Sequence, residues 1–147
     1  MGRHIYEALK PNHEVIGIDC ANGPCVDYVC DLSRPETTAL VAAMEPEVLY
    51  HLASIAREGA SFFQPCRVTS SNIMAYVNTL TGCLQYKGFR KVVLFSSMAV
   101  YGNQKPPFDE NLPPKPCDVY GVNKAAMEDI TKLQCDLFGK AYTIIRP

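Results

Sequence analysis

The chain has 147 residues, of which 48% are hydrophobic and 20% are charged, and its formal net charge is -1. These proportions are typical of a globular protein and exclude a fibrous or intrinsically disordered chain. The 14 Lys and Arg residues are interspersed with 15 Asp and Glu residues, so neither nucleic acid nor an anionic membrane is an expected partner. The N-terminus has no apolar signal segment, and no run approaches about 18 apolar residues, which favours a cytoplasmic location.

The cysteines and histidines do not form a recognisable disulfide or metal pattern. The seven cysteines are odd in number and include no C-x-x-C pair. Reduced structural thiols are expected because cytosolic disulfides are rare, and metal binding is the main alternative. The three histidines, His4, His13 and His51, are scattered along the sequence. We therefore assign no metal.

Short apolar runs alternate with amphipathic stretches along the first half of the chain. An opening helix is predicted to end at Pro11, before strands over residues 14–19 and 26–31. Residues 33–36, Ser-Arg-Pro-Glu, have the spacing of a capping box and predict a helix that runs to about Met44. The apolar run 48–53 has the length of a strand that is covered on both faces.

The same alternation continues in the second half. A strand is predicted over 91–97, and a surface loop over 104–116 because that segment holds five of the 11 prolines. A last strand spans 142–146. Two long helices show apolar stripes at helical spacing. Their stripe residues are Ile73, Val77, Leu80 and Leu84, closed by Gly88, and then Met127, Ile130, Leu133 and Leu137. Alternating strands and helices indicate the α/β class with a parallel sheet.

Polar side chains follow several predicted strands at the point where each strand ends. They are Asp19, Asp31, Ser54 and the pair Ser96-Ser97. In open α/β sheets, ligands bind beyond the carboxyl ends of the strands. These side chains are therefore expected to line one crevice.

Tyr120 and Lys124 lie four residues apart at the start of a predicted helix, so both project from one face. An unperturbed tyrosine has a pKa of about 10, and a nearby ammonium group favours tyrosinate, which suits a base near neutral pH. By itself the Y-x-x-x-K pattern is weak, since a surface tyrosine and a solvated lysine produce it by chance.

Its context makes the pattern specific, because the surrounding motifs resemble the NAD-dependent epimerase/dehydratase family of extended short-chain dehydrogenases/reductases. Residues 95–102, Phe-Ser-Ser-Met-Ala-Val-Tyr-Gly, are similar to the family's serine-rich strand end followed by V-Y-G. The family's E-x-x-P-x-x-P-x-x-x-Y-G-x-x-K spacing is matched by Glu110, Pro113, Pro116, Tyr120 and Lys124. Further similarities are His51-Leu52-Ala53-Ser54, the pair Pro65 and Asn72, and Ile145-Arg146-Pro147.

The resemblance implies catalytic roles for three residues. Tyr120 would be the base, Lys124 its electrostatic partner and a ligand of the nicotinamide ribose, and Ser97 would hydrogen-bond the substrate hydroxyl. Ser97 rather than Ser96 is implied because it lies three residues before Val100. Asn72 would hold the active-site geometry through the neighbouring strand and is counted with the cofactor-binding residues, with a helix-capping or surface asparagine as the alternative.

The resemblance also implies NAD as the cofactor. Asp19 would accept hydrogen bonds from the adenosine ribose, and no arginine follows it to bind the 2'-phosphate of NADP. Asp31 and Leu32 would flank the adenine. Gly2 would be the last glycine of the dinucleotide fingerprint. The segment Leu52, Ala53 and Ser54 would pass under the cofactor.

Compared with that family, residues 1–147 are expected to form one partial NAD-binding domain with a Rossmann-like doubly wound parallel sheet. The first strand and the C-terminal substrate domain are absent, so a fragment or an internally started gene model is expected. In a sheet ordered 3-2-1-4-5-6 the first strand is central. Its absence predicts a gap between two halves of the sheet, and the chain alone is expected to be inactive.

The function implied is a nucleotide-sugar epimerase, in which Tyr120 removes a hydroxyl proton while NAD takes the hydride. Dehydration is disfavoured because Ser97-Met98-Ala99 replaces the T-D-E of the dehydratases. A reductase of the same family and a non-catalytic dinucleotide-binding protein remain alternatives. The helices around Ile73 and Met127 resemble those through which the family forms homodimers, although their apolar stripes could equally cover the sheet.

Overall fold

The computed structural model describes residues 1–56 and 58–147, with the backbone alone for Glu58 and Ala60. Helices and strands alternate along the chain, as the sequence predicts. In order they are α1 (Gly2–Leu9), β1 (Ile18–Asp19), β2 (Tyr28–Val29), α2 (Thr37–Ala43), β3 (Val48–His51), α3 (Glu58–Phe63), α4 (Pro65–Thr69), the π-helical turn η1 (Ser70–Met74), α5 (Ala75–Gln85), β4 (Lys91–Phe95), the 3-10 turn η2 (Met98–Tyr101), α6 (Val119–Phe138) and β5 (Ala141–Ile145).

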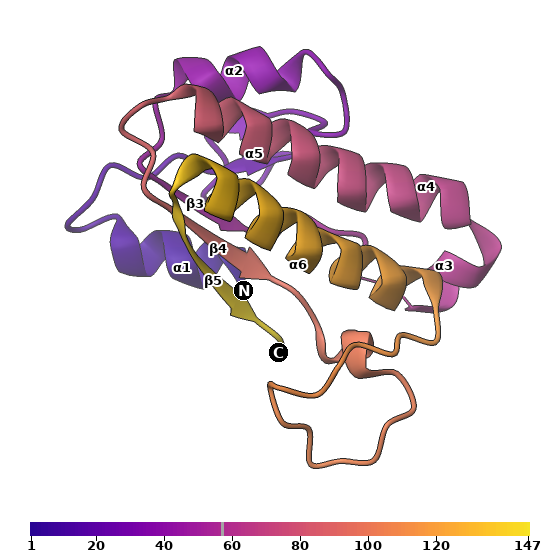
Figure 1. The fold of residues 1–147 in the computed structure, drawn as a ribbon. Helices are drawn as coiled ribbons and strands as arrows, with labels where there is room; N and C mark the ends of the chain where they lie inside the picture. Colours follow the sequence, from indigo (N-terminus) through magenta and orange to yellow (C-terminus); the bar gives the residue numbers. More distant parts are fainter. Residues whose placement is uncertain (57) are drawn as a thin grey trace.

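The strands form two separate parallel sheets, which confirms the predicted α/β class and the predicted gap. One sheet pairs β1 with β2, and the other has the order β3-β4-β5, whose strands are labelled in Figure 1. This is the division expected when a sheet ordered 3-2-1-4-5-6 lacks the strand at its centre. All carboxyl ends within each sheet lie at the same edge, because every pair is parallel.

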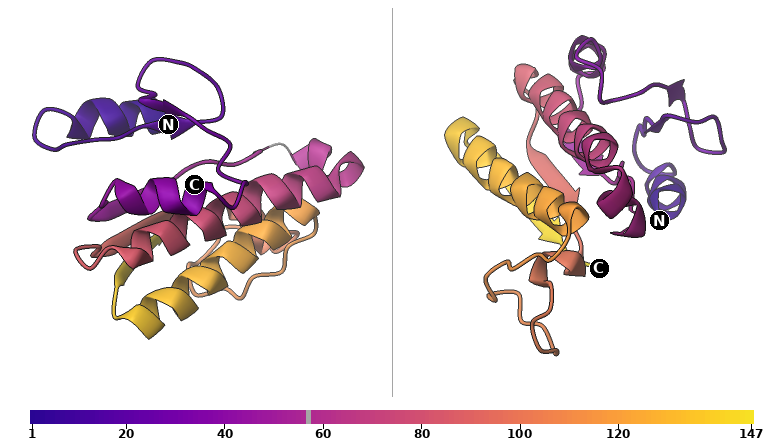
Figure 2. Two further views of the ribbon diagram at one scale, coloured as in Figure 1. Left: turned by 90° about the horizontal axis from the view of Figure 1, so that it is seen from above. Right: turned by 90° about the vertical axis from the view of Figure 1, so that its right-hand side faces the viewer.

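Helices α5 and α6 lie side by side on one face of the three-stranded sheet, and α1 lies off its other side (Figure 2). Helix α1 has no buried residue, and Val48 and Tyr50 of β3 are 37% and 40% exposed, so the expectation that this strand is covered on both faces is wrong. A hydrogen bond of 2.5 Å between the hydroxyls of Tyr76 and Thr131 joins α5 to α6. The core between these layers buries apolar residues of β4 and α5. Its members include Val92, Leu94, Tyr76, Leu80, Cys83 and Phe89.

The segment before α2 differs from the predicted capping box. Ser33 donates from both its amide and its hydroxyl to Asp31 Oδ1, at 3.0 and 2.7 Å. Since these bonds engage the Ser33 hydroxyl in a turn capped by Asp31, the helix begins later, at Thr37, without a side-chain cap. The Thr37 hydroxyl then donates to the Arg34 carbonyl at 2.6 Å. Local side-chain bonds to Asp31 therefore compete successfully with helix initiation.

The apolar stripe predicted for the last helix is wrong in its C-terminal half. Leu133 and Leu137 of α6 are 69% and 75% exposed. Beside Met127 and Cys135, the buried face carries polar residues that find partners inside the fold, namely Asn123, Lys124, Glu128 and Thr131. Of the other predicted stripe, Ile73 of η1 and Val77 and Leu84 of α5 are half-buried, whereas Leu80 of α5 is buried. That helix ends at Gln85, with Tyr86 extended, so Gly88 does not close it.

All seven cysteines are free thiols. Within residues 1–56 and 58–147, no cluster of three His, Cys, Asp or Glu side chains is arranged to hold a metal ion. No helix in the described part of the chain is long and apolar enough to cross a membrane.

Candidate functional site

The carboxyl end of β4 meets the first turns of α6. Asp118 caps α6, its Oδ1 accepting a hydrogen bond of 2.6 Å from the Gly121 amide. This cap fixes the start of the helix, so Tyr120 and Lys124 both lie on its buried face. The Lys124 ammonium lies 5.8 Å from the centre of the Tyr120 ring. Tyr120 and Lys124, the two residues of the Y-x-x-x-K pattern, are therefore adjacent in the fold.

Lys124 is held against the strand end rather than solvated. Its side chain is only 2% exposed, and Nζ donates a hydrogen bond of 2.8 Å to the Phe95 carbonyl at the end of β4. Burial lowers the pKa of Lys124 from 10.5 to about 8. The amine therefore stays mostly protonated at neutral pH, and two of its three protons remain for other acceptors.

This lowered pKa predicts a pH-dependent stability. Between about pH 8 and 10.5 the unfolded chain binds more protons at Lys124 than the folded chain, so the free energy of unfolding rises with pH through this window. Relative to Lys124→Met, the unmodified protein should gain on the order of 3 kcal/mol between about pH 7 and about pH 10.5. Urea unfolding of both proteins at the two pH values measures the difference. An equal change in the unfolding free energy of both proteins would show that the Lys124 amine is not buried.

Ser97 lies in the turn that joins β4 to η2. Its Oγ accepts a hydrogen bond of 3.2 Å from the Ala99 amide and so caps η2. A Cβ at Gly121 would lie 2.6 Å from the Ala99 carbonyl oxygen and 3.0 Å from Pro116 Cβ. Glycine at position 121 thus allows the first turn of α6 to pack directly on the turn that carries Ser97.

Gly121→Ala is accordingly expected to destabilise the fold by about 1–3 kcal/mol, because the new methyl group overpacks this contact. This loss should outweigh the gain of about 1 kcal/mol in helix propensity. Gly2→Ala in α1 is a matched control, since a Cβ there has no atom within 4 Å. Urea unfolding should show a loss for Gly121→Ala alone, and equal behaviour of the two variants would refute the close approach.

The end of β3 contributes a second set of buried polar groups. The Asn72 side chain, in η1, accepts from the Ile55 amide at 2.7 Å and donates to the Ile55 carbonyl at 3.4 Å. These bonds tie the segment after β3 to the helix. Leu52 and Ala53 are half-buried there. The Ser54 Oγ is buried and has no hydrogen-bond partner among the described residues.

His51 is a buried site residue to which the sequence reasoning gave no role. Its ring lies 4.8 Å from that of Tyr76, and its Nε2 has no hydrogen-bond partner in the described part of the chain. Burial, reinforced by the charge of Lys124 and opposed by the Ala53 backbone, lowers the pKa of His51 to about 3. The imidazole is therefore neutral, and Lys124 carries the positive charge of this region.

The two-stranded sheet carries the remaining predicted cofactor residues. Asp19 ends β1 with an exposed carboxylate whose Oδ1 accepts from the Ala21 amide at 3.1 Å. Asp31 is also exposed, and its hydrogen bonds with Ser33 lower its pKa. The Leu32 side chain is buried in the core, so only its backbone can contact a ligand. Gly2 is exposed at the start of α1.

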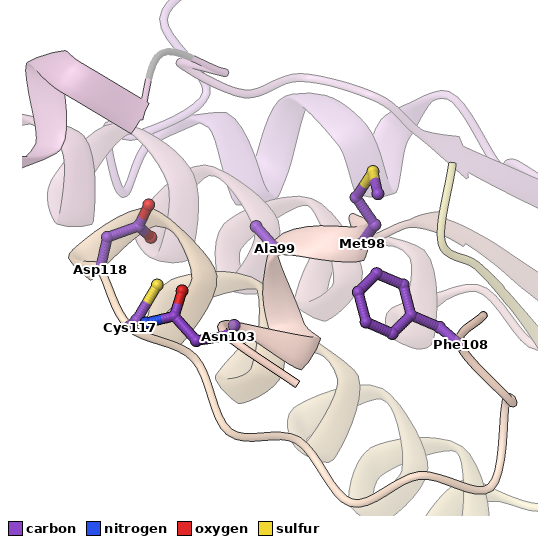
Figure 3. A pocket seen from close by; sticks show the side chains of 7 residues that line it. Met98, Ala99, Asn103, Phe108, Cys117 and Asp118 are labelled. Atoms are coloured by element: carbon purple, nitrogen blue, oxygen red, sulfur yellow. The ribbon is translucent and has the colours of Figure 1, made fainter. Parts of the chain in front are cut away.

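A pocket of about 260 Å³ opens between the Ser97 turn and the start of α6. Figure 3 shows Met98 and Phe108 on one side of it, and Cys117 and Asp118 on the other. Asp118 is the acidic residue of this lining, and its Oδ1 is engaged as the cap of α6. Ser97, Tyr120 and Lys124 are not among the residues that line the pocket, which offers apolar contacts but no free acid beside Met98.

Glu128 and Arg146 are further site residues that the sequence reasoning did not identify. Arg146 donates from Nε and Nη2 to the two carboxylate oxygens of Glu128, at 2.8 and 2.6 Å. The Ser96 hydroxyl donates to the same carboxylate. The available signal was the position of Glu128, four residues after Lys124 and therefore on the same face of α6.

Many of the known proteins that this chain resembles are UDP-sugar epimerases. The chain is 28% identical to the putative UDP-glucose 4-epimerase of Methanocaldococcus jannaschii, over 99% of this chain and 51% of that protein. It is 27% identical to the methionine adenosyltransferase 2 subunit beta of Xenopus tropicalis, over 84% of this chain and 37% of that protein. The crystal structure of Thermus thermophilus UDP-glucose 4-epimerase in complex with NAD is 26% identical, with a TM-score of 0.89 over 99% of this chain and 50% of that chain.

The chain thus spans about half the length of the epimerases that it matches. A family model covers it completely, from residue 1 to residue 147. On this evidence the chain belongs to the NAD dependent epimerase/dehydratase family.

Proposed function

We propose that the protein is an NAD-dependent epimerase of nucleotide-sugars, with Tyr120, Lys124 and Ser97 as its catalytic residues. The observation that carries the proposal is the junction of β4 and α6. There Lys124, buried and bonded to the Phe95 carbonyl, lies over the Tyr120 ring, and Ser97 occupies the turn on which α6 packs.

In this proposal Tyr120 accepts the proton of a sugar hydroxyl, while Ser97 hydrogen-bonds the same hydroxyl. The Lys124 ammonium stabilises the phenolate by its charge, which is strong because the surroundings are buried. NAD, when bound, would supply hydride removal from the sugar carbon and hydride return to its opposite face, the chemistry that inverts that carbon.

The residues present fit NAD at several points. The exposed Asp19 carboxylate can accept hydrogen bonds from ribose hydroxyls. The buried Ser54 Oγ needs a hydrogen-bond partner that the described residues do not supply. Lys124 keeps two donor protons beyond the one given to Phe95. Asn72 would act indirectly, by holding the segment after β3. Asp31, Leu32 and Gly2 are proposed on the family resemblance.

Epimerisation is favoured over dehydration by the side chains beside Ser97. Dehydration needs an acid next to the catalytic hydroxyl group, whereas the adjoining Met98 and Ala99 have none, and Asp118 is occupied as a helix cap. A reductase of the same family would use the same residues. We propose a cytoplasmic location, which the seven free cysteines support because disulfides are rare there. We also propose a homodimer formed through α5 and α6.

The test is an activity panel on the complete gene product with UDP-glucose, UDP-galactose, UDP-glucuronate and UDP-N-acetylglucosamine. Interconversion of one 4-epimer pair without net consumption of NAD supports the epimerase. Net NADH formation would instead identify a dehydrogenase. A 4-keto-6-deoxy product would identify a dehydratase.

A second candidate is a dinucleotide-binding subunit of another enzyme. The similarity to a protein named as a methionine adenosyltransferase subunit favours it. The intact Tyr120–Lys124 pair argues against it, because a binding subunit needs no buried base. NAD binding by the complete gene product with no turnover of any nucleotide-sugar would select this candidate.

A further inference from the structure

Glu128 and Arg146 form an ion pair in the interior of the fold. Their side chains are 1% and 15% exposed, whereas the other ion pairs of the described residues lie at the surface. The guanidinium binds both carboxylate oxygens, a geometry that holds the two groups in one orientation. Apolar residues of similar size commonly stabilise a fold no less than a buried ion pair does. The notable property of the Glu128–Arg146 pair is therefore the geometry that it fixes.

Each member of the pair also holds a segment of the candidate site. The Ser96 hydroxyl donates a hydrogen bond of 2.5 Å to Glu128 Oε1. Arg146 Nη1 donates to the Tyr101 hydroxyl at 2.8 Å and to the Glu110 carbonyl at 3.1 Å. The guanidinium carbon also lies 4.9 Å from the centre of the Tyr101 ring. The pair therefore connects the end of β5, the end of β4, η2 and the proline-rich loop to α6.

Two successive turns of α6 hold neighbouring residues at the end of β4. Lys124 binds the Phe95 carbonyl, and Glu128, one turn later, binds the Ser96 hydroxyl. Ser97 is the next residue of the chain. The helix face that carries Tyr120 thus also fixes the backbone that presents Ser97.

We propose that Glu128 and Arg146 are positioning residues that set Ser97 at its working distance from Tyr120. The inference rests on the proposed epimerase activity, which assigns the substrate hydroxyl to Ser97 and Tyr120. Reacting groups tolerate little displacement, and a shift of about 1 Å can lower turnover about 100-fold. Without the pair, the Ser96–Tyr101 segment loses its side-chain attachment to α6 and β5.

The test compares Arg146→Lys and Glu128→Gln with Glu47→Gln, all in the complete gene product. Lysine keeps the positive charge of Arg146 but cannot bind both carboxylate oxygens and Tyr101 together. Glu47 is the matched control because its pair with Arg90 is exposed, with side chains 58% and 71% accessible. Hydrogen exchange of residues 96–101 and steady-state kinetics with the nucleotide-sugar turned over by the unmodified protein are the two readouts.

The expected result for both site variants is faster exchange over residues 96–101 and a kcat lowered about 10-fold to 100-fold. The KM should change by no more than about twofold, because the hydrogen bond of Ser97 is the one substrate contact that the variants displace. Exchange in α5 should be unaltered, and Glu47→Gln should match the unmodified protein. Unchanged exchange over 96–101, or faster exchange with unchanged kcat, would overturn the proposal.

If Arg146→Lys also speeds hydrogen exchange in α5, the substitution has destabilised the whole fold. The double variant Glu128→Met/Arg146→Met then tests the positioning role, because an apolar pair can preserve packing. Lowered kcat with normal exchange in α5 then supports the positioning role, and retained kcat overturns it. Failure of the proposed function gives a different result, namely no turnover by the unmodified protein. In that case exchange over residues 96–101 alone tests whether the pair fixes the Ser97 turn.

Discussion

Tyr120→Phe is expected to lower the kcat of the complete gene product by about 10²–10⁴-fold, the range for loss of a general base. NAD affinity should be nearly unchanged, because phenylalanine preserves the ring against which Lys124 lies. Steady-state kinetics with the epimerised nucleotide-sugar and calorimetric titration with NAD measure the two quantities separately. Loss of kcat with retained binding separates the enzyme from a binding subunit.

Tyr142→Phe is the matched control, since it removes the same hydroxyl from a tyrosine of β5 that is 39% exposed. It should leave kcat unchanged. Wild-type turnover in Tyr120→Phe would exclude Tyr120 as the base. Equal losses of NAD binding and turnover would indicate that the substitution damages the cofactor site instead.

The layout of the fold was predictable because its signals are local. The apolar run of β4, the prolines of the 104–116 loop and the four-residue spacing of Tyr120 and Lys124 each depend on neighbours in sequence. The division into two sheets was predictable only through the family resemblance, which supplied the strand order and the strand missing from its centre. The family resemblance added roles for Ser97 and Asp19 that no local pattern could supply.

The buried face of α6 was not predictable in the same way. Hydrophobic periodicity selected Leu133 and Leu137, which are exposed, since it assumes that buried positions are apolar. Here Thr131 is buried because Tyr76 of α5 bonds its hydroxyl. Glu128 is buried because Arg146, 18 residues away in the sequence, compensates its charge. Such long-range pairs leave no periodic signal.

The second large effect is expected on the free energy of unfolding when the Glu128–Arg146 pair is broken. Arg146→Met would leave the Glu128 carboxylate buried without its counter-charge, which costs about 3–5 kcal/mol of unfolding free energy. The double variant Glu128→Met/Arg146→Met should recover most of this loss, because it removes the stranded charge as well as its partner. Arg90→Met, which breaks the exposed pair with Glu47, should cost no more than about 1 kcal/mol.

Urea unfolding at neutral pH ranks the three variants. The order of the three unfolding free energies is decisive, since a charge costs free energy only where water cannot reach it. A single Arg146→Met variant as stable as Arg90→Met would mean that water solvates Glu128 and that the pair lies effectively at the surface. A double variant as unstable as the single one would mean that the hydrogen bonds to Ser96 and Tyr101, and not the stranded charge, carry the energy of this junction.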